Sequence, residues 1–411
     1  MMKKRILSLL ACGALTVGAT AGLTACGDKG ITLWGPSEQQ AMLKEMVASF
    51  LEENPDFKYE INFGVVSEAD AYANLSKDVA ASADVYAFAN DQLMNLKTIG
   101  ALARLGDEAA AKVAAENDAD SVASGKVDGV QYAYPYASDN GFFMYYDKSV
   151  ISETQAQTLE GVLAACEDAG KYFIFDIDNS WYVGSFIYGA GGDYTINWNG
   201  SLVDSINCDF DQKPTGVNYT YGEIGGQALI ELNAHEGFKN GDDTVISSYL
   251  SDKKFGACVS GTWKAKEMSE KLGENYGATK LPTYHSTLTD KDYQIKSFSG
   301  FKLYGVNPTS KHLAEAHQLA AYLSGEKMQE KRFDTLGTGP SNKTVAALSK
   351  VQSNIALAAL QAQMPHAKIQ DSLPPSYWSS MEAFGTDIYG KKTTSDNLSE
   401  KITKLVEALK A

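Results

Sequence analysis

The sequence predicts an α/β fold of two lobes, each built on a largely parallel sheet. Three observations support this prediction. Short apolar strands alternate with helices over residues 31–88, and the same alternation returns from residue 171. No internal repeat, low-complexity tract or Gly/Ser linker separates the two stretches. Because strands that alternate with helices form parallel sheets, we expect two α/β lobes between which the chain crosses several times.

The first unit reads as a strand, a helix and a second strand. Ser37 and Gln40 have the spacing of a capping box, apolar residues follow at helical intervals, and Pro55 ends the helix. Alternating apolar residues then indicate a strand. In this half we expect strands at 31–34, 59–63 and 84–88, a helix between Ser37 and Pro55, and a helix over 71–81.

The second half repeats the pattern. The segments "KYFIFDI", "FGACVSG" and "KLYGVN" are apolar and short, and helix-like segments follow the last two. We expect strands at 171–177, 255–261 and 302–307, helices at 262–272 and 310–325, and a mostly helical chain from Val345 onward.

The N-terminus has the layout of a secretory signal. Three basic residues at 3–5 precede an uncharged stretch, 6–25, that is rich in Leu, Ala, Gly and Thr. A transmembrane anchor is the alternative, but Gly and Thr dilute the run, and it ends in "LTAC" rather than in basic residues. "LTAC" resembles the bacterial lipobox. We therefore expect a lipoprotein signal peptide at 1–25, lipidation of Cys26, and a protein tethered to the outer face of the cell membrane.

Charge and cysteine content exclude several classes of protein. The chain of 411 residues carries a formal net charge of −15, which argues against nucleic-acid partners and against adhesion to anionic lipid. After Cys26, the cysteines Cys166, Cys208 and Cys258 are too widely spaced for a CxxC metal or redox motif. One disulfide is possible in an exported protein, and buried free thiols are the alternative.

A catalytic or cofactor site is not evident. The sequence contains no G-x-S-x-G elbow, phosphate-binding loop or H-E-x-x-H motif. "DIDNSWY" begins like a calcium loop but lacks the later glycine and acid that such a loop needs. We expect no metal, no cofactor and no enzymatic activity. With so many carboxylates, a glycosidase pair could be chosen freely, so the sequence does not support one.

Aromatic and polar residues follow several predicted strands. Ligands of open α/β sheets bind beyond the carboxyl ends of strands, and sugars stack their apolar faces on aromatic rings while planar polar groups bind their hydroxyls. The residues at these positions are Trp34, Glu38, Phe88, Asn90, Asp91 and Trp263. This pattern favours a carbohydrate ligand.

Several segments, taken in order along the chain, resemble those of a known family. They are "ITLWGPSEQ", "ADVYAFANDQL", "VDGVQYAYPYASDNGFFMYYDKS", "FGACVSGTWKAKE", "NYGATKLPTY", "FSGFKLYGVNPTSKHLAEAHQLAAYL" and "SYWSSMEAF". The family is that of extracytoplasmic solute-binding proteins of ABC sugar importers, in the maltose/maltodextrin-binding branch. The resemblance covers nearly the whole mature chain.

The resemblance implies a two-lobed periplasmic-binding-protein-like fold with a hinge and a ligand cleft. It implies an N-terminal lobe of 26–139 and 299–350 and a C-terminal lobe of 140–298 and 351–411, with crossings near Asn140, Ser299 and Lys350. The implied ligand is a maltooligosaccharide, the implied partner is an ABC permease, and we expect a monomer. By position, the implied ligand-binding residues are Trp34, Glu38, Phe88, Asp91, Asp139, Trp181, Trp263 and Trp378.

Some positions depart from the family pattern. Gln92 stands where the enterobacterial maltose binders carry arginine, and Phe88 replaces a tryptophan. These departures leave the preferred chain length and linkage open. Two alternatives also remain open, namely a surface glycoside hydrolase acting on starch-type glucans and the same fold with another oligosaccharide cargo.

Overall fold

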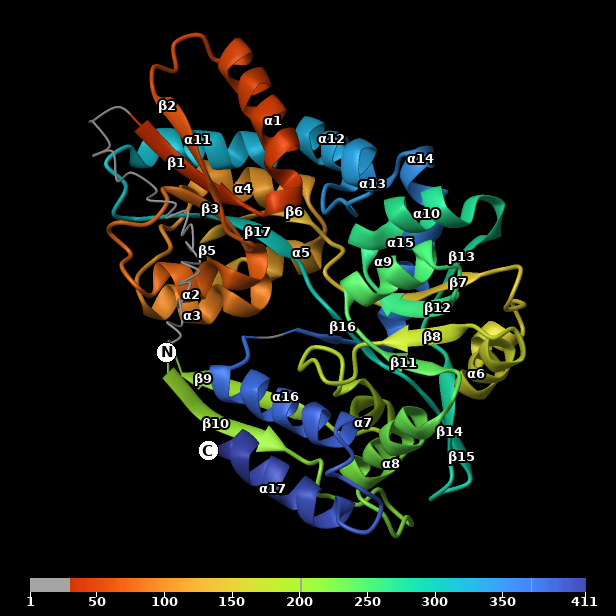
Figure 1. Cartoon of the computed structure of the whole chain (residues 1–411). Helices are drawn as coiled ribbons and strands as arrows, with labels where there is room; N and C mark the ends of the chain where they lie inside the picture. Colours follow the sequence, from red (N-terminus) through yellow and green to blue (C-terminus); the bar gives the residue numbers. More distant parts are fainter. Residues whose placement is uncertain (1–29, 200–201, 371) are drawn as a thin grey trace, which may run out of the picture.

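Two five-stranded sheets organise the chain, one in each of two lobes (Figure 1). The computed structural model describes residues 30–199, 202–370 and 372–411. In spatial order, the N-terminal-lobe sheet holds β2 (Glu60–Val65), β1 (Gly30–Gly35), β3 (Val85–Ala89), β17 (Lys302–Val306) and β6 (Ala133–Ala137). The C-terminal-lobe sheet holds β11 (Phe238–Asn240), β8 (Tyr172–Phe175), β12 (Phe255–Ser260), β7 (Phe143–Asp147) and β13 (Tyr276–Thr279).

The two sheets share one topology. Each contains three neighbouring parallel strands, followed by one antiparallel strand and a fifth that pairs with it, so the sheets are mixed rather than largely parallel. The antiparallel strands β17 and β7 are each entered from the other lobe. A strand that runs parallel to its neighbour is reached from it through a helical crossover within the same lobe. The chain reaches β17 and β7 without such a crossover. The mixed direction therefore follows from the crossings of the chain.

Four two-stranded ladders complete the strands: β4 (Lys126–Val127) with β5 (Val130–Gln131), β9 (Tyr194–Asn199) with β10 (Leu202–Cys208), β14 (Thr283–Ser286) with β15 (Lys291–Gln294), and β16 (Ser297–Ser299) with β18 (Ala367–Ile369). The last ladder is parallel, and β16 lies between the two lobes in Figure 1.

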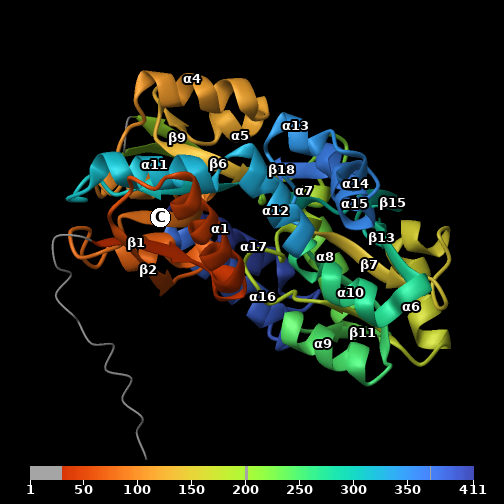
Figure 2. The same cartoon turned by 90° about the horizontal axis from the view of Figure 1, so that it is seen from above.

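Helices cover both faces of each sheet. Around the first sheet lie α1 (Gln40–Glu53), α2 (Ala71–Leu75), α3 (Leu93–Thr98), α4 (Asp107–Glu116), α5 (Ala119–Ala123), α11 (Leu313–Leu323) and α12 (Glu326–Leu336). Around the second lie α6 (Leu159–Asp168), α7 (Ser185–Gly189), α8 (Tyr221–Ala234), α9 (Asp243–Ser251), α10 (Ala265–Leu272), α15 (Ile355–Gln363), α16 (Pro375–Tyr389) and α17 (Leu398–Lys410). The short α13 (Lys343–Ala346) and α14 (Ser349–Gln352) lie, with α12, where the lobes meet (Figure 2).

Short 3₁₀ turns precede or connect several helices: η1 (Ser37–Gln39), η2 (Glu68–Asp70), η3 (Asn90–Gln92), η4 (Gln155–Gln157), η5 (Thr262–Lys264), η6 (Gly273–Asn275) and η7 (Met364–His366). Of these, η1, η3 and η5 follow the strands β1, β3 and β12 directly. They carry most of the side chains that the sequence places at strand ends.

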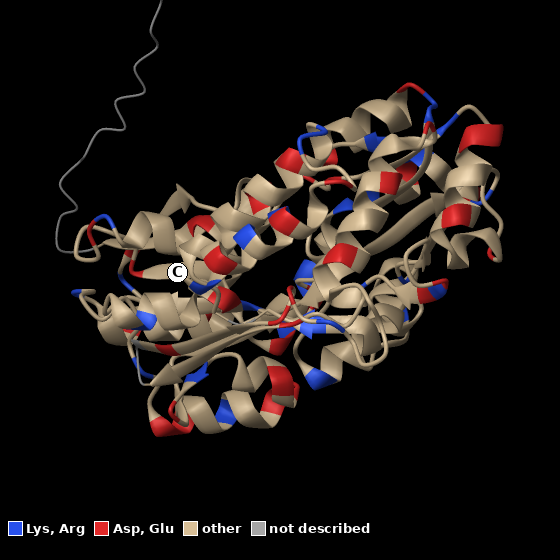
Figure 3. Cartoon of the chain, turned by 90° about the horizontal axis from the view of Figure 1, so that it is seen from below, with Lys and Arg blue, Asp and Glu red and all other residues tan. Residues whose placement is uncertain are grey.

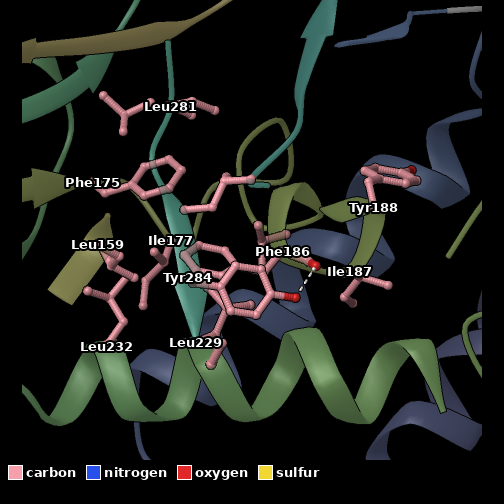
Figure 4. Packing of buried hydrophobic residues seen from close by; sticks show 14 of the residues in the cluster. Leu159, Phe175, Ile177, Phe186, Ile187, Tyr188, Leu229, Leu232, Leu281 and Tyr284 are labelled. Atoms are coloured by element: carbon pink, nitrogen blue, oxygen red, sulfur yellow. Dashed lines mark hydrogen bonds between the residues drawn. The ribbon is translucent and has the colours of Figure 1, made fainter. Parts of the chain in front are cut away.

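The hydrophobic cores separate by lobe. Two clusters draw on residues 31–137 and 301–328, and two others draw on residues 142–298 and 356–409. The largest cluster packs α7 and α8 against β14, and the Tyr284 hydroxyl there donates a 2.9 Å hydrogen bond to the Phe186 carbonyl (Figure 4). Each fully buried side chain of this kind contributes roughly 1.5–3 kcal/mol, so each lobe has a substantial core of its own.

Two local predictions were wrong. Ser37 and Gln40 form no capping box, because the Gln40 side chain instead donates a 2.7 Å hydrogen bond to the carbonyl of Gly35. The helix predicted over 71–81 ends at Leu75, and the carboxylate of Asp78 accepts hydrogen bonds from the backbone of Ala80 and Ala81 in a turn. In both places a local side-chain bond to the backbone competes with the regular structure.

Cys166, Cys208 and Cys258 are buried free thiols, so the disulfide alternative is not realised. Acidic and basic residues are interspersed over both lobes, without a continuous basic stripe in the view of Figure 3. Within the described residues, none of the helices is both long enough and apolar enough to span a bilayer. Cys26 and the segment 1–25 lie outside the described residues.

Candidate functional site between the lobes

Two tryptophans from neighbouring strand ends form a pair in the C-terminal lobe. Trp181 follows β8 and Trp263 lies in η5 after β12, and these strands are parallel neighbours. The ring centroids lie 5.9 Å apart, with 37° between the ring planes. Because the carboxyl ends of parallel strands meet at one sheet edge, two segments 82 residues apart supply one aromatic surface. The structure thus brings together two of the three tryptophans expected in this lobe.

Trp181 is fixed on several sides. Its indole N–H donates a 2.8 Å hydrogen bond to the side-chain carbonyl of Gln370, and its ring meets the edges of Phe142 and Tyr182 at centroid distances of 4.8 and 5.1 Å. Edge-to-face contacts and a satisfied N–H hold an indole in one orientation. Trp181 is therefore a rigid part of the aromatic surface.

Trp263 is the more exposed member of the pair. Its side chain is 37% exposed, and its indole N–H donates a 2.7 Å hydrogen bond to the Asp243 carboxylate. The ring lies directly over Gly261, where a side-chain carbon would come within 2.0 Å of the ring. An exposed aromatic held by a hydrogen bond and seated on a glycine is well suited to stack on a ligand.

Trp378 lies apart from this pair. It is in the first turns of α16, half-buried, and its ring contacts are with Tyr377 at 5.1 Å and Phe298 at 6.2 Å. Pro375 is the first residue of this helix. Trp378 therefore packs partly against the core of its lobe and keeps part of its surface exposed.

Asp139 joins the first crossing to the loop that carries Trp263. Its Oδ2 accepts hydrogen bonds from the Thr262 hydroxyl at 2.7 Å and from the Gly339 backbone N–H at 2.8 Å. The residue is 2% exposed, and its Oδ1 is buried without a partner among the described residues. A buried carboxylate oxygen without a partner is costly, which is typical of functional positions.

Asp91 faces the same region from the N-terminal lobe. It is 8% exposed, and its Oδ1 also lacks a hydrogen-bond partner among the described residues. Burial raises the pKa of Asp91 to about 7, against a smaller lowering of the pKa by a hydrogen bond from Gln370. Gln370 therefore connects Asp91 of one lobe with Trp181 of the other.

Gln370 is a residue that sequence analysis missed. Besides its side-chain bonds, its backbone carbonyl accepts a 2.8 Å hydrogen bond from the Asn90 amide, and its N–H donates to Ser299. It follows β18 and lies against the second crossing. The only signal in the sequence is its place in "AKIQD", and no spacing rule identifies it.

The other predicted residues of the N-terminal lobe differ in their placement. Trp34 is half-buried and lies over Gly64, and Glu38 is exposed in η1. Phe88 is fully buried in the core, so its ring is not part of the exposed aromatic surface in this structure. It belongs to a central strand of a sheet that is covered on both faces, so the side chains on both faces of this strand are buried. Gln92 is buried as well, and its side chain bonds the backbone of Tyr72 and Glu68.

A separate cavity lies at the crossings. It has a volume of 660 Å³, and its lining includes Asp139, Asn140, Gly300, Gly339 and Gln361 but no tryptophan. The aromatic surface and this cavity are thus different surfaces of the interlobe region. In the described part of the chain, no group of three or more His, Cys, Asp or Glu residues is placed to hold a metal ion.

Comparisons with known proteins agree with this architecture. The profile of the family described as bacterial extracellular solute-binding protein matches residues 45–359. A galactooligosaccharide-binding protein of Bacillus subtilis (strain 168) is 27% identical over 379 residues, which cover 90% of this chain and 85% of that protein.

Solved structures add to this. A structure with acarbose is 31% identical, with a TM-score of 0.81, and the match covers 93% of this chain and 99% of that one. A maltodextrin-binding protein from L. casei BL23 without ligand has a TM-score of 0.76 at 22% identity, with coverage of 93% and 99%. The resemblance inferred from the sequence and the two-lobed α/β fold are confirmed. This chain belongs to the bacterial extracellular solute-binding protein family.

Proposed function

We propose that the protein is a lipid-anchored extracytoplasmic receptor that binds maltooligosaccharides and delivers them to an ABC permease. The observation that carries the proposal is the Trp181–Trp263 pair, which offers an aromatic surface beside the unpartnered carboxylate oxygens of Asp91 and Asp139. Sugar rings stack on such surfaces, and carboxylates accept hydrogen bonds from their hydroxyls. Trp34, Glu38 and Trp378 complete the proposed site, and Phe88 is left out of it.

The proposed mechanism is closure of the two lobes on the ligand. The hydrophobic clusters change between residues 137 and 142, 298 and 301, and 351 and 356. This supports lobes of 26–139 with 299–350 and of 140–298 with 351–411, connected by three crossings. A ligand that contacts both lobes favours the closed state through its extra contacts there. The protein acts as a monomer and does no bond chemistry.

Titration calorimetry tests the ligand. Maltotriose and maltotetraose should bind, whereas galacto- and xylo-oligosaccharides of equal length should bind at least tenfold more weakly. The galacto-oligosaccharides are included because one relative is named for them. A preference for galacto-oligosaccharides would replace the proposed cargo and leave the receptor function in place.

Product analysis tests the absence of catalysis. A glycoside hydrolase needs two carboxylates about 5–10 Å apart on either side of the scissile bond. After prolonged incubation with maltoheptaose, chromatography should recover only maltoheptaose. Release of shorter glucans, absent with heat-denatured protein, would support the hydrolase instead.

A further inference from the structure

Lys302 occupies the edge of the N-terminal-lobe sheet that faces the other lobe. It is the first residue of β17, and its neighbours across the ladder are Ala89 of β3 and Ala137 of β6. Because β17 is antiparallel to both strands, its first residue lies at their carboxyl ends, immediately beside Asn90–Asp91 and Ser138–Asp139. The small alanine side chains leave room for the long lysine side chain at this edge.

The Lys302 ammonium lies opposite the aromatic surface of the C-terminal lobe. Its Nζ is 5.9 Å from the centroid of the Trp263 ring. That distance is at the outer limit of a cation–π contact, so the contact itself is weak. The lysine and the tryptophan belong to different lobes, and a sugar ring stacked on Trp263 would bring its hydroxyl groups next to the ammonium.

The Lys302 ammonium has no hydrogen-bond or ion-pair partner within the described residues. The buried Lys264 of this region differs, because its ammonium bonds the Ser247 hydroxyl at 2.6 Å and the Glu267 carboxylate at 2.5 Å. A lysine ammonium has three donors and no acceptor. The Lys302 side chain is half-buried, so these donors remain accessible to solvent and to a ligand.

The charges around Lys302 keep it protonated. Burial lowers the pKa of Lys302, but the carboxylates of Glu68, Asp139 and Glu38 outweigh this effect and raise the pKa above its ordinary value. None of these carboxylates is close enough to form an ion pair with it. The ammonium is thus retained as a cation and a hydrogen-bond donor while its donors stay available.

We propose that Lys302 is a ligand-binding residue, whose ammonium donates hydrogen bonds to hydroxyl oxygens of the sugar ring that stacks on Trp263. The inference rests on the proposed oligosaccharide-receptor function. It places a cationic donor of one lobe beside the rim of a sugar ring that stacks on an aromatic face of the other. Hydrogen bonds from a charged donor to a hydroxyl are stronger than neutral ones, so this residue contributes to affinity and to the choice of hydroxyl pattern.

Lys302→Met removes the ammonium and keeps a long apolar stem. Lys44→Met is the matched control, because the Lys44 ammonium also lies 5.9 Å from an aromatic centroid, that of Phe63, on the exposed side of α1. In calorimetric titrations with maltotriose, Lys302→Met should bind about 10- to 100-fold more weakly than wild type. Lys44→Met should bind as wild type does, and the urea midpoint of Lys302→Met should not fall. Lys302→Gln serves as a second variant if the methionine protein does not fold.

A set of maltose analogues, each lacking one hydroxyl, separates direct contact from an indirect effect. For at least one analogue, removal of the hydroxyl should weaken binding to the wild-type protein. The same removal should weaken binding to Lys302→Met by a factor at least threefold smaller, or not at all. Wild-type affinity in both Lys302 variants, or additive losses with every analogue, would overturn the inference and leave the proposed function standing. Failure of wild type to bind any oligosaccharide of the panel would overturn both.

Discussion

Gly261→Ala should displace the indole of Trp263 without touching the ligand itself. A methyl group at Gly261 would lie 2.0 Å from Cζ3 and 2.2 Å from Cη2 of that indole. Carbon atoms in contact are about 3.5–4.0 Å apart, so the ring must move by about 1.5 Å or more. The backbone of Gly261 has φ −106° and ψ −172°, which alanine adopts without strain. The perturbation is therefore confined to the aromatic surface and to the Trp263–Asp243 hydrogen bond.

The displacement should cost affinity much more than stability. Loss of an aromatic anchor commonly costs ~2 kcal/mol of binding free energy, which corresponds to roughly 30-fold in affinity. The indole is 37% exposed and can swing toward solvent, so the free energy of unfolding should fall by less than about 1 kcal/mol. Titration calorimetry with maltotriose measures the first quantity and urea unfolding measures the second.

Gly106→Ala is the control for this experiment. It is the same chemical change at a glycine of extended backbone, with no atom within 4 Å of the added methyl group. Its maltotriose affinity should equal that of wild type. If Gly261→Ala also bound maltotriose with wild-type affinity, the stacking role of Trp263 would be refuted, because the ring cannot keep its present position beside the methyl group.

Three further predictions concern separate parts of the account. Cys26→Ser should yield a folded, sugar-binding protein in the soluble fraction, and full retention of this variant in washed membranes would contradict lipid anchoring. Trp378→Ala should weaken maltotriose binding by roughly 30-fold, whereas a lower urea midpoint with unchanged affinity would make Trp378 a packing residue only. Burial raises the pKa of Asp91 to about 7 in the folded protein, so its contribution to stability is present below pH 4 and is lost as the pH rises to 7. The free energy of unfolding of Asp91→Asn should therefore exceed that of wild type increasingly between pH 5 and pH 8, by up to about 4 kcal/mol at 1.36 kcal/mol per pKa unit. Parallel curves of stability against pH for the two proteins would contradict this. The sugar affinity of Asp91→Asn should fall.

The strands and long helices could be predicted because their signals are local. β8, β12 and β17 each lie within a segment predicted as a strand, and β3 extends one residue beyond its segment, because a buried strand is a short apolar run whatever its neighbours are. The direction of β7 and β17 could not be derived in this way, because it depends on which lobe the chain comes from. Likewise, Asp78 ends a predicted helix through bonds that helix periodicity does not register.

Residues of the candidate site could be predicted only where they directly follow the ends of strands. Trp181 and Trp263 were predicted as site residues, and the parallel pairing of β8 and β12 explains why they meet. Phe88 also follows the pattern, but a central strand buries it, and its burial depends on helices far away in the sequence. Gln370 is held by Trp181, which is 189 residues away in the chain, and Lys302 lies near Trp263 of the other lobe. Polar residues of this kind carry no periodicity, so the folded structure was needed to find them.

Small-angle scattering of the wild-type protein, with and without saturating maltotetraose, tests the central claim most directly. The claim is that a bound oligosaccharide contacts both lobes and closes them. The radius of gyration should decrease on binding, and the Trp181→Ala variant should need a higher sugar concentration for the same decrease. Superimposable scattering curves, at a sugar concentration that calorimetry shows to be saturating, would contradict lobe closure.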